Sequence, residues 1–533
     1  MRGRRVAFAA ALLGAITLAV NLATAARDLV DGDGAELQTL AILGGIPHPS
    51  GYPIWALLAR AFGALWPGPL AFRATALSAC CGAAAVAALV VLLGEMGLGL
   101  AAALAGAALI GAGFTFRLAS IRPEVYTLAG LLLVLAFRTT LLAAHSGRRR
   151  DVATAGVLMG LAVTGHFAMA PAVAVLGAWL ALRPAREGRP ARALFVAAGA
   201  AAGLLPYFYL VTQDRPYAPM NYLVTTIELG ARQFGLTPAT FAHAWQRIPW
   251  LVLGHETRPT FFLLHPGQLR FNLELLAAHA LFFDPGPLVT PIAIVGLAAA
   301  WRRDRTVAAL LATLIVVSVL FAAALAYGKL LPVFAQPATL GIGLCAAFGI
   351  EAIAARVRAT CRSVIAVRAA IVVTLVLGVV LAQALRIHAQ SHPIGPLGWH
   401  VEEKPPRITT LLPRLDRYDE ARRYGAAAMR AIPPGALVVG RWTEIAILRY
   451  LREVEGVRRD LTLDSYYPAH RIRLERWQRA HDPRERPLVF LSRWPELGLA
   501  IAPTESLEIR PGRWMRVQRT PLAPAAAVRD SGS

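Results

Sequence analysis

The chain has 533 residues, of which 56% are hydrophobic and only 16% are charged, and its mean hydropathy is +0.52. A soluble core of this length cannot bury so much apolar surface, so the composition excludes an ordinary soluble protein and indicates a membrane protein. The formal net charge of +22 comes from basic residues in short loops and in the C-terminal region. They are not interleaved with aromatic residues along one face, which argues against nucleic acid as a partner.

The N-terminal segment carries Arg2, Arg4 and Arg5 before a long apolar stretch, which is a pattern typical of signal peptides. The Ala-rich sequence at 23–26 would allow cleavage. We interpret the segment as a retained first helix, because the loop that follows it carries the most informative residues of the chain.

Apolar blocks then follow one another, each about as long as the roughly 17–25 residues that cross a hydrocarbon layer. Lipid offers the backbone no hydrogen-bond partners, so each block is expected to be a helix. The sequence predicts about eleven spans, at 6–26, 70–93, 97–115, 124–143, 152–166, 168–182, 193–211, 287–301, 306–327, 331–352 and 369–387.

Basic loops set the expected orientation, because Lys and Arg favour the cytoplasmic side. Four such loops fall on one side of the predicted spans, at 148–150, 183–192, 302–305 and 356–368. The N-terminus is then cytoplasmic, and the loop 27–69, the long loop 212–286 and the chain after about 388 lie outside, in the periplasm of a bacterial inner membrane. The long loop is too apolar and aromatic for a solvated linker, which predicts interfacial helices.

The character of the sequence changes near residue 390. Residues 1–390 are predicted to form a transmembrane domain and residues 391–533 a small soluble domain. In the second part strand-like and helical patterns alternate, which predicts an α/β arrangement. The expected strands are 436–440, 461–463 and 488–491, and the expected helices are 444–455 and 470–480. The sequence there shows no phosphate loop, metal-ligand spacing or nucleophile elbow, so acceptor binding and structural support remain alternative roles.

The first outer loop contains the strongest candidates for chemistry. If the segment is helical, Asp33 and Glu36 share one face, and apolar neighbours could raise the pKa of either carboxylate toward that of a general base. The alternative is that these two, with Asp28 and Asp31, form a solvated acidic loop.

Several ionisable residues are predicted at the same membrane face, namely Arg73, Arg117, Arg122, Glu124 and His166. Each arginine alone could place its charged end in the interface. Acids and bases together at one depth are better explained by a polar cavity, in which arginine binds a phosphate and a carboxylate takes a proton.

His48, Tyr52 and Tyr126 complete the candidate site. The run from His48 to Pro53, with Tyr52 inside it, has little freedom to be a helix and predicts a rigid turn beside the acidic pair. For His166, structural hydrogen bonding and a catalytic role remain open alternatives, and Tyr126 also suits an interfacial belt residue.

These motifs resemble those of a known polytopic family. The run Asp33-Gly34-Ala35-Glu36-Leu37, then Leu43-Gly44, His48-Pro49-Ser50-Gly51-Tyr52-Pro53, Phe72-Arg73, Glu124-Val125-Tyr126 and Gly160-Leu161 with His166 are similar to the ordered signatures of glycosyltransferase family 117. That family has the GT-C fold, and its animal members are similar to protein O-mannosyltransferases. The chain departs from it at Ala35, Ser50 and Arg122, where glycine, proline and a small residue are usual.

The resemblance implies an inverting glycosyltransferase with an outward-facing site, a polyprenyl-phosphate sugar donor, mannose being one candidate sugar, and a protein, lipid or glycan acceptor. It implies a loop carboxylate as base, for which Asp33 is favoured over Glu36, with Arg73, Arg117 or Arg122 holding phosphate. The expected substrate-binding residues also include His48, Tyr52, Glu124, Tyr126 and His166. A divalent metal is compatible with this chemistry, but nothing in the sequence demands one and no metal ligands are predicted.

Two other functions remain as alternatives. Intramembrane charge also suits a transporter or flippase of lipid-linked or anionic solutes, although the sequence shows no paired repeat. The second alternative is that the membrane part only anchors a C-terminal binding domain.

Overall fold

The structure is a computed structural model. It describes residues 2–183, 188–215, 218–223, 243–255, 265–325, 331–360, 364–389, 413–465, 470–491, 505–510 and 513–519. The domain boundary expected near residue 390 lies at the start of the segment 390–412, which is outside the described residues.

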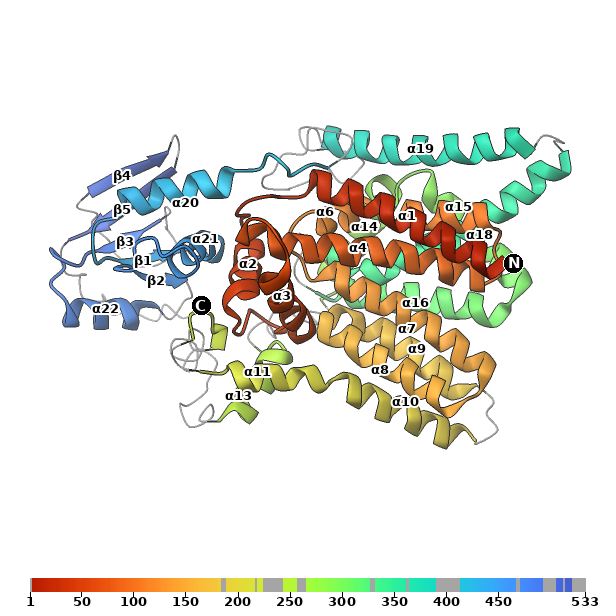
Figure 1. The fold of residues 1–533 in the computed structure, drawn as a ribbon, viewed down its shortest axis with the longest axis horizontal. Helices are drawn as coiled ribbons and strands as arrows, with labels where there is room; N and C mark the ends of the chain where they lie inside the picture. Colours follow the sequence, from red (N-terminus) through yellow and green to blue (C-terminus); the bar gives the residue numbers. More distant parts are fainter. Residues whose placement is uncertain are drawn as a thin grey trace.

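Most of the described chain forms a bundle of apolar helices that run side by side (Figure 1). Their bounds are α1 Arg2–Thr24, α4 Leu70–Glu95, α5 Leu100–Ala112, α6 Phe114–Ser120, α7 Tyr126–Ser146, α8 Arg149–Gly165, α9 Ala170–Leu182, α10 Arg189–Gly203, α15 Val289–Arg303, α16 Arg305–Ala323, α18 Gln336–Thr360 and α19 Val364–Ala389. Each of the eleven predicted spans overlaps helix in the structure. The bundle satisfies its backbone hydrogen bonds within helices, as lipid requires.

Length separates these helices into two groups. Within the described residues, six helical segments are long and apolar enough to cross a membrane, and the bent pair α5 and α6 would make seven. The segments corresponding to α8, α9 and α15 are shorter than a full crossing. The structure therefore supports a polytopic integral membrane protein.

Close helix contacts depend on small residues. Gly156 and Gly160 of α8 face Gly199 and Gly203 of α10, and a Cβ on Gly160 would lie 2.3 Å from the carbonyl oxygen of Ala200. Glycine at four-residue spacing on both helices lets the backbones touch, which is a common device in membrane bundles.

Short helices cover one end of the bundle. The loop after α1 carries α2 Asp33–Leu43 and α3 Pro53–Leu65. The later loop contributes α13 Ala244–Val252 and α14 Pro266–Ala278, so helices do form in the region expected to be interfacial. The short helix α11 Phe208–Gln213 precedes them and ends the span that begins with α10. Residues 224–242 and 256–264 of that loop lie outside the described residues. Two short one-turn helices, a π-helical turn and α17 connect the longer elements, at η1 Phe167–Met169, η2 Leu205–Tyr207, η5 His279–Phe283 and α17 Leu331–Phe334.

A five-stranded sheet with helices forms the C-terminal unit, which we define as residues 413–519. The elements are α20 Glu420–Ala431, β1 Leu437–Gly440, α21 Trp442–Glu453, β2 Thr462–Ser465, α22 His470–Ala480, β3 Leu488–Phe490, β4 Glu505–Arg510 and β5 Arg513–Gln518. The strand order is β2-β1-β3-β5-β4, parallel among the first three strands and antiparallel beyond them. The α/β prediction is confirmed, and β4 and β5 were not predicted.

The C-terminal unit lies beyond α2 and α3, at the end of the bundle away from the N-terminus (Figure 1). Arg422 of α20 donates to both carboxylate oxygens of Asp28 and to Glu455, and the Leu415 amide donates to the carbonyl of Thr24 at 2.8 Å. The unit is therefore fixed to the loop that carries the acidic pair.

Candidate active site

The acidic pair lies on the first turn of α2. Gly32, with φ of 64°, turns the chain into this helix, and Asp33 and Glu36 then place negative charge at its N-terminus, where the helix dipole favours it. Gln38 fixes the helix in place, since its buried amide donates to the carbonyls of Asp28 and Ala71. The prediction that the two carboxylates share a helical face is confirmed.

The turn that carries His48 closes over this pair. His48 and Gly51 are joined by a backbone hydrogen bond of 3.0 Å, and α3 begins directly afterwards with Pro53 at its first position. Gly45 passes so close to the chain at Met220 that an added Cβ would lie 2.0 Å from the Met220 carbonyl oxygen. The rigid turn expected from the sequence is therefore present, and it is anchored against the later loop.

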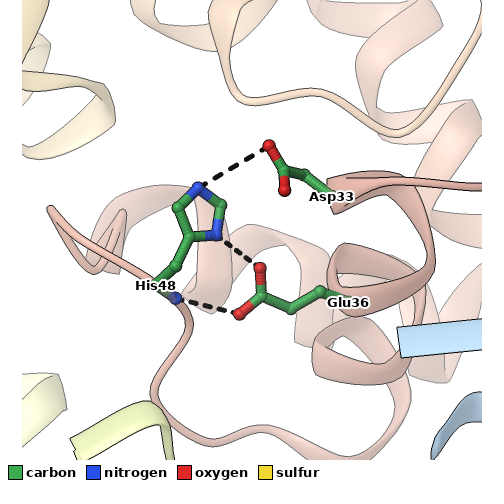
Figure 2. A group of neighbouring side chains, drawn as sticks. All are labelled: Asp33, Glu36 and His48. Carbon is green, nitrogen blue, oxygen red and sulfur yellow. Dashed lines mark hydrogen bonds and ion pairs between the residues drawn. The ribbon is translucent and has the colours of Figure 1, made fainter. Parts of the chain in front are cut away.

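Asp33, Glu36 and His48 meet at this point (Figure 2). Glu36 is fully buried, and its carboxylate accepts both the backbone amide of His48, at 2.9 Å, and the ring Nδ1. Asp33 is about half exposed, and its Oδ2 lies 3.8 Å from Nε2 of His48. One carboxylate is thus enclosed, whereas the other remains open to a ligand.

Hydrogen bonds define the charge of His48. The Tyr52 hydroxyl donates its only proton to the carbonyl of Pro49, so it can only accept from Nε2 of His48, at 2.9 Å. Nδ1 must likewise donate to Glu36. Burial alone would lower the pKa of His48, but the carboxylates of Glu36 and Asp33 outweigh it and raise that pKa to about 10. His48 is therefore an imidazolium at neutral pH.

This charge bears on metal binding. Asp33, Glu36 and His48 each offer a ligand atom, and these atoms lie within 4.8 Å of one another, a spacing that suits a divalent cation. Histidine binds a metal only as the neutral ring. The imidazolium occupies that position between the carboxylates, so the cluster fits a metal only after His48 loses its proton.

A second ion pair borders the cluster. Arg122 donates to Glu124, whose backbone is held by Ser78 and by the Trp55 indole at 3.1 Å. Burial raises the pKa of Glu124 in spite of Arg122. The charges of Asp33 and His48 also act on Glu124, so this ion pair is electrostatically coupled to the acidic loop.

The rings of Tyr52, His166 and Tyr126 pack together next to His48. His166 stacks on Tyr52 with ring centroids 5.5 Å apart and an angle of 10°, and it also contacts Tyr126 at 4.7 Å. Its Nδ1 accepts from the amide of Ala168, so it caps the short helix Phe167–Met169. His166 is therefore a buried packing and capping residue beneath Tyr52, which favours the structural alternative.

Two predicted arginines lie elsewhere. Arg73 donates to the carbonyls of Gly63 and Gly68. Arg117 is buried and donates to the side chains of Asn21 and Thr24 on α1. Both therefore tie helices together, and the structure does not bring them to the acidic cluster.

Two residues of α21 near this site, Trp442 and Arg449, were not predicted. The Trp442 ring lies edge-on to His48, with centroids 6.3 Å apart. The amphipathic pattern at 444–455 predicted the helix, but nothing local indicated that it packs on a loop some 400 residues earlier.

Comparison with known proteins supports the same resemblance. Residues 33–187 match the family model described as the protein O-mannosyl-transferase TMEM260 N-terminal domain. Protein O-mannosyl-transferase TMEM260 of Mus musculus is 32% identical over 216 residues, which cover 38% of this chain and 30% of the mouse protein. The resemblance read from the sequence is confirmed. The match spans less than a third of the mouse protein's length.

A solved structure resembles the whole chain. ArnT from Cupriavidus metallidurans, crystallised with undecaprenyl phosphate, aligns with a TM-score of 0.52 over 96% of this chain and 98% of its own, at 15% sequence identity. At this identity the likeness concerns the fold. The chain therefore shares the polytopic helical fold of this membrane protein.

Proposed function

We propose that the protein is a membrane glycosyltransferase that moves a sugar from a polyprenyl-phosphate donor to an acceptor hydroxyl. The observation that carries the proposal is the pairing of an open carboxylate, Asp33, with an enclosed one, Glu36, around His48. The relatives support it, since one is named a protein O-mannosyl-transferase and the fold neighbour holds undecaprenyl phosphate. Mannose is therefore the first sugar to test. The site then lies at the outer membrane face, which is the periplasmic face in a bacterium.

Exposure assigns the two carboxylates different roles. Asp33 is about half exposed, so its oxygens can reach an acceptor hydroxyl and take the proton. Glu36 is fully buried and is occupied by the amide and ring of His48. Asp33 is thus the general base, and Glu36 positions His48.

The reaction is a single displacement. The acceptor oxygen attacks the anomeric carbon, its proton passes to Asp33, and the bond between that carbon and the phosphate oxygen breaks. The products are the glycosylated acceptor and the polyprenyl phosphate, with inversion at the anomeric centre. Cationic groups must stabilise the phosphate as its charge develops.

Arg122 is the cation of the predicted set that borders the cluster. It is half buried and already paired with Glu124, and burial, which would lower its pKa, is outweighed by the carboxylates of Glu124, Asp31 and Asp33. Arg122 can therefore screen the phosphate, while much of its charge is balanced by Glu124.

Transfer and transport give different products. The test reconstitutes the purified chain in liposomes with radiolabelled polyprenyl-phosphate mannose on the outer leaflet and hydroxyl-bearing peptides or glycans outside. Glycosyl transfer predicts labelled acceptor of inverted configuration and an equal amount of polyprenyl phosphate. A transporter would instead move the intact labelled lipid to the inner leaflet, and that result would contradict the proposal.

A further inference from the structure

The C-terminal unit shares a buried core with the first outer loop. Helix α21 packs across α2, the helix that carries Asp33 and Glu36 (Figure 1). Leu29 and Ala35 of the loop lie in one hydrophobic cluster with Ile445 and Leu448 of α21. This core brings one face of α21 to the edge of the candidate site.

Trp442, the first residue of α21, contacts the site directly. Its ring lies edge-on to His48, at 6.3 Å between centroids and 73°, and edge-on to Tyr222, at 5.4 Å and 73°. The half-buried indole thus fills the space between the His48 turn and the later loop.

Arg449 lies two helical turns further along the same helix. Residues seven apart share a helical face, so Arg449 follows Trp442 toward the site. Its guanidinium carbon lies 5.9 Å from the centroid of the Trp442 ring, and Nη1 donates to the sulfur of Met220 at 3.6 Å. Of the charges that act on Arg449, the carboxylate of Glu36 is the strongest, which places it toward the same cluster.

The pairing of Arg449 differs from that of other arginines at this end. Arg122 pairs with Glu124, Arg422 with Asp28 and Glu455, and Arg452, on the same helix, with Glu453 at 3.0 Å. Within the described part of the chain, Arg449 has no carboxylate in ion-pair contact. It is a half-buried cation beside the candidate site, on which the carboxylates of Glu36, Glu453 and Asp464 act without direct contact.

We propose that Arg449 binds the phosphate of the lipid-linked donor, so that the C-terminal unit supplies one wall of the active site. The inference rests on the proposed function and adds a donor-binding residue to it. A guanidinium presents paired N–H donors that match two phosphate oxygens, which a lysine ammonium cannot reproduce. Trp442 holds the His48 turn against α21 and so sets the distance between the phosphate site and Asp33.

The test compares Arg449→Gln and Arg449→Lys with the matched control Arg452→Gln. Equilibrium binding of radiolabelled polyprenyl monophosphate to the chain in nanodiscs, with uncharged polyprenol as competitor, measures the site without any transfer step. We expect Arg449→Gln to weaken phosphate binding about ten- to a hundredfold, as for loss of a charged hydrogen bond. Arg449→Lys should weaken it less, and Arg452→Gln should bind as the wild type does.

Transfer kinetics provide the second measurement. With the same variants, the donor KM should rise in parallel with the binding constant while the acceptor KM stays unchanged. Wild-type binding of polyprenyl monophosphate by both Arg449 variants would overturn the inference, as would a change in the acceptor KM alone. If Arg449→Gln does not fold, Arg449→Lys keeps the packing of the side-chain stem, and unchanged binding in that variant overturns the inference. Absence of sugar transfer by the wild type would instead contradict the proposed function.

Discussion

The buried carboxylate of Glu36 binds His48 at two points. One oxygen accepts the backbone amide of His48 at 2.9 Å, and the other accepts its ring Nδ1. The Tyr52 hydroxyl accepts from the other ring nitrogen at 2.9 Å. A positive charge is thereby fixed between Glu36 and Asp33 before any substrate binds. Such preorganisation leaves Asp33 as the carboxylate that a substrate can reach.

Replacing Glu36 should destabilise the protein. Glu36→Gln removes the charge from a fully buried acceptor and leaves the His48 imidazolium with a weaker partner, so we expect a loss of about 3 kcal/mol in the free energy of unfolding. Denaturant titration in detergent measures it. Glu274→Gln, at a surface pair with Arg270, is the control and should cost about 0.5 kcal/mol or less. Equal losses in the two variants would show that Glu36 holds no buried charge.

Stability should fall as the pH rises through the alkaline range. The folded pKa of His48, about 10, lies above its unfolded value of 6.5. A raised pKa contributes stability that is complete below the unfolded value and is lost as the pH rises through the folded value. The wild type should therefore lose stability relative to His48→Gln between about pH 6.5 and 10. Denaturation midpoints for both proteins across this window check the prediction, and parallel curves would refute it.

The backbone crossing at Gly45 should not tolerate a side chain. A Cβ there would lie 2.0 Å from the carbonyl oxygen of Met220, and φ is already 122°. Gly45→Ala should cost about 1–3 kcal/mol and lower transfer activity, because the His48 turn would be displaced. Gly267→Ala, where the nearest atom is 3.5 Å away, is the control. Thermal unfolding together with the rate of transfer measures both effects, and wild-type behaviour of Gly45→Ala would contradict this reading of the crossing.

The ion pair between Arg422 and Asp28 should contribute modestly to docking of the C-terminal unit. Both side chains are partly exposed, so a double-mutant cycle with Arg422→Gln and Asp28→Asn should give a coupling energy of about 0.5–1 kcal/mol. The coupling should shrink at high salt. Additive effects of the two substitutions would mean that the apolar core with α21 alone holds the unit in place.

Much of the fold follows from local sequence. The length of the apolar blocks predicted eleven spans, and each of them overlaps a helix in the structure. Alternating patterns in the C-terminal part predicted β1, β2 and β3 and the helices between them. Helices α8, α9 and α15 are apolar but short, so hydropathy alone does not show whether each of them crosses the membrane. The strands β4 and β5 form an antiparallel pair at one edge of the sheet, and local sequence patterns did not predict it.

The site was predictable where its members are close in sequence. The three-residue spacing of Asp33 and Glu36 and the turn at His48 came from one loop, and the structure joins them. Arg73 and Arg117 were grouped with this loop by membrane depth alone, and depth does not determine the direction of a side chain. Arg449 lies near Glu36, and Arg422 pairs with Asp28, although these partners are hundreds of residues apart in the sequence. Local periodicity does not predict contacts between such distant segments.

The central claim is that Asp33 takes the proton of the acceptor hydroxyl. Its most direct test is the rate of sugar transfer from polyprenyl-phosphate donor by Asp33→Asn in nanodiscs, with Asp419→Asn, an exposed carboxylate on the C-terminal unit, as the control. We predict that kcat falls about 10²–10⁴-fold in Asp33→Asn, with donor binding and unfolding midpoint preserved, and stays at the wild-type value in Asp419→Asn. A kcat in Asp33→Asn equal to that of the wild type would contradict the account.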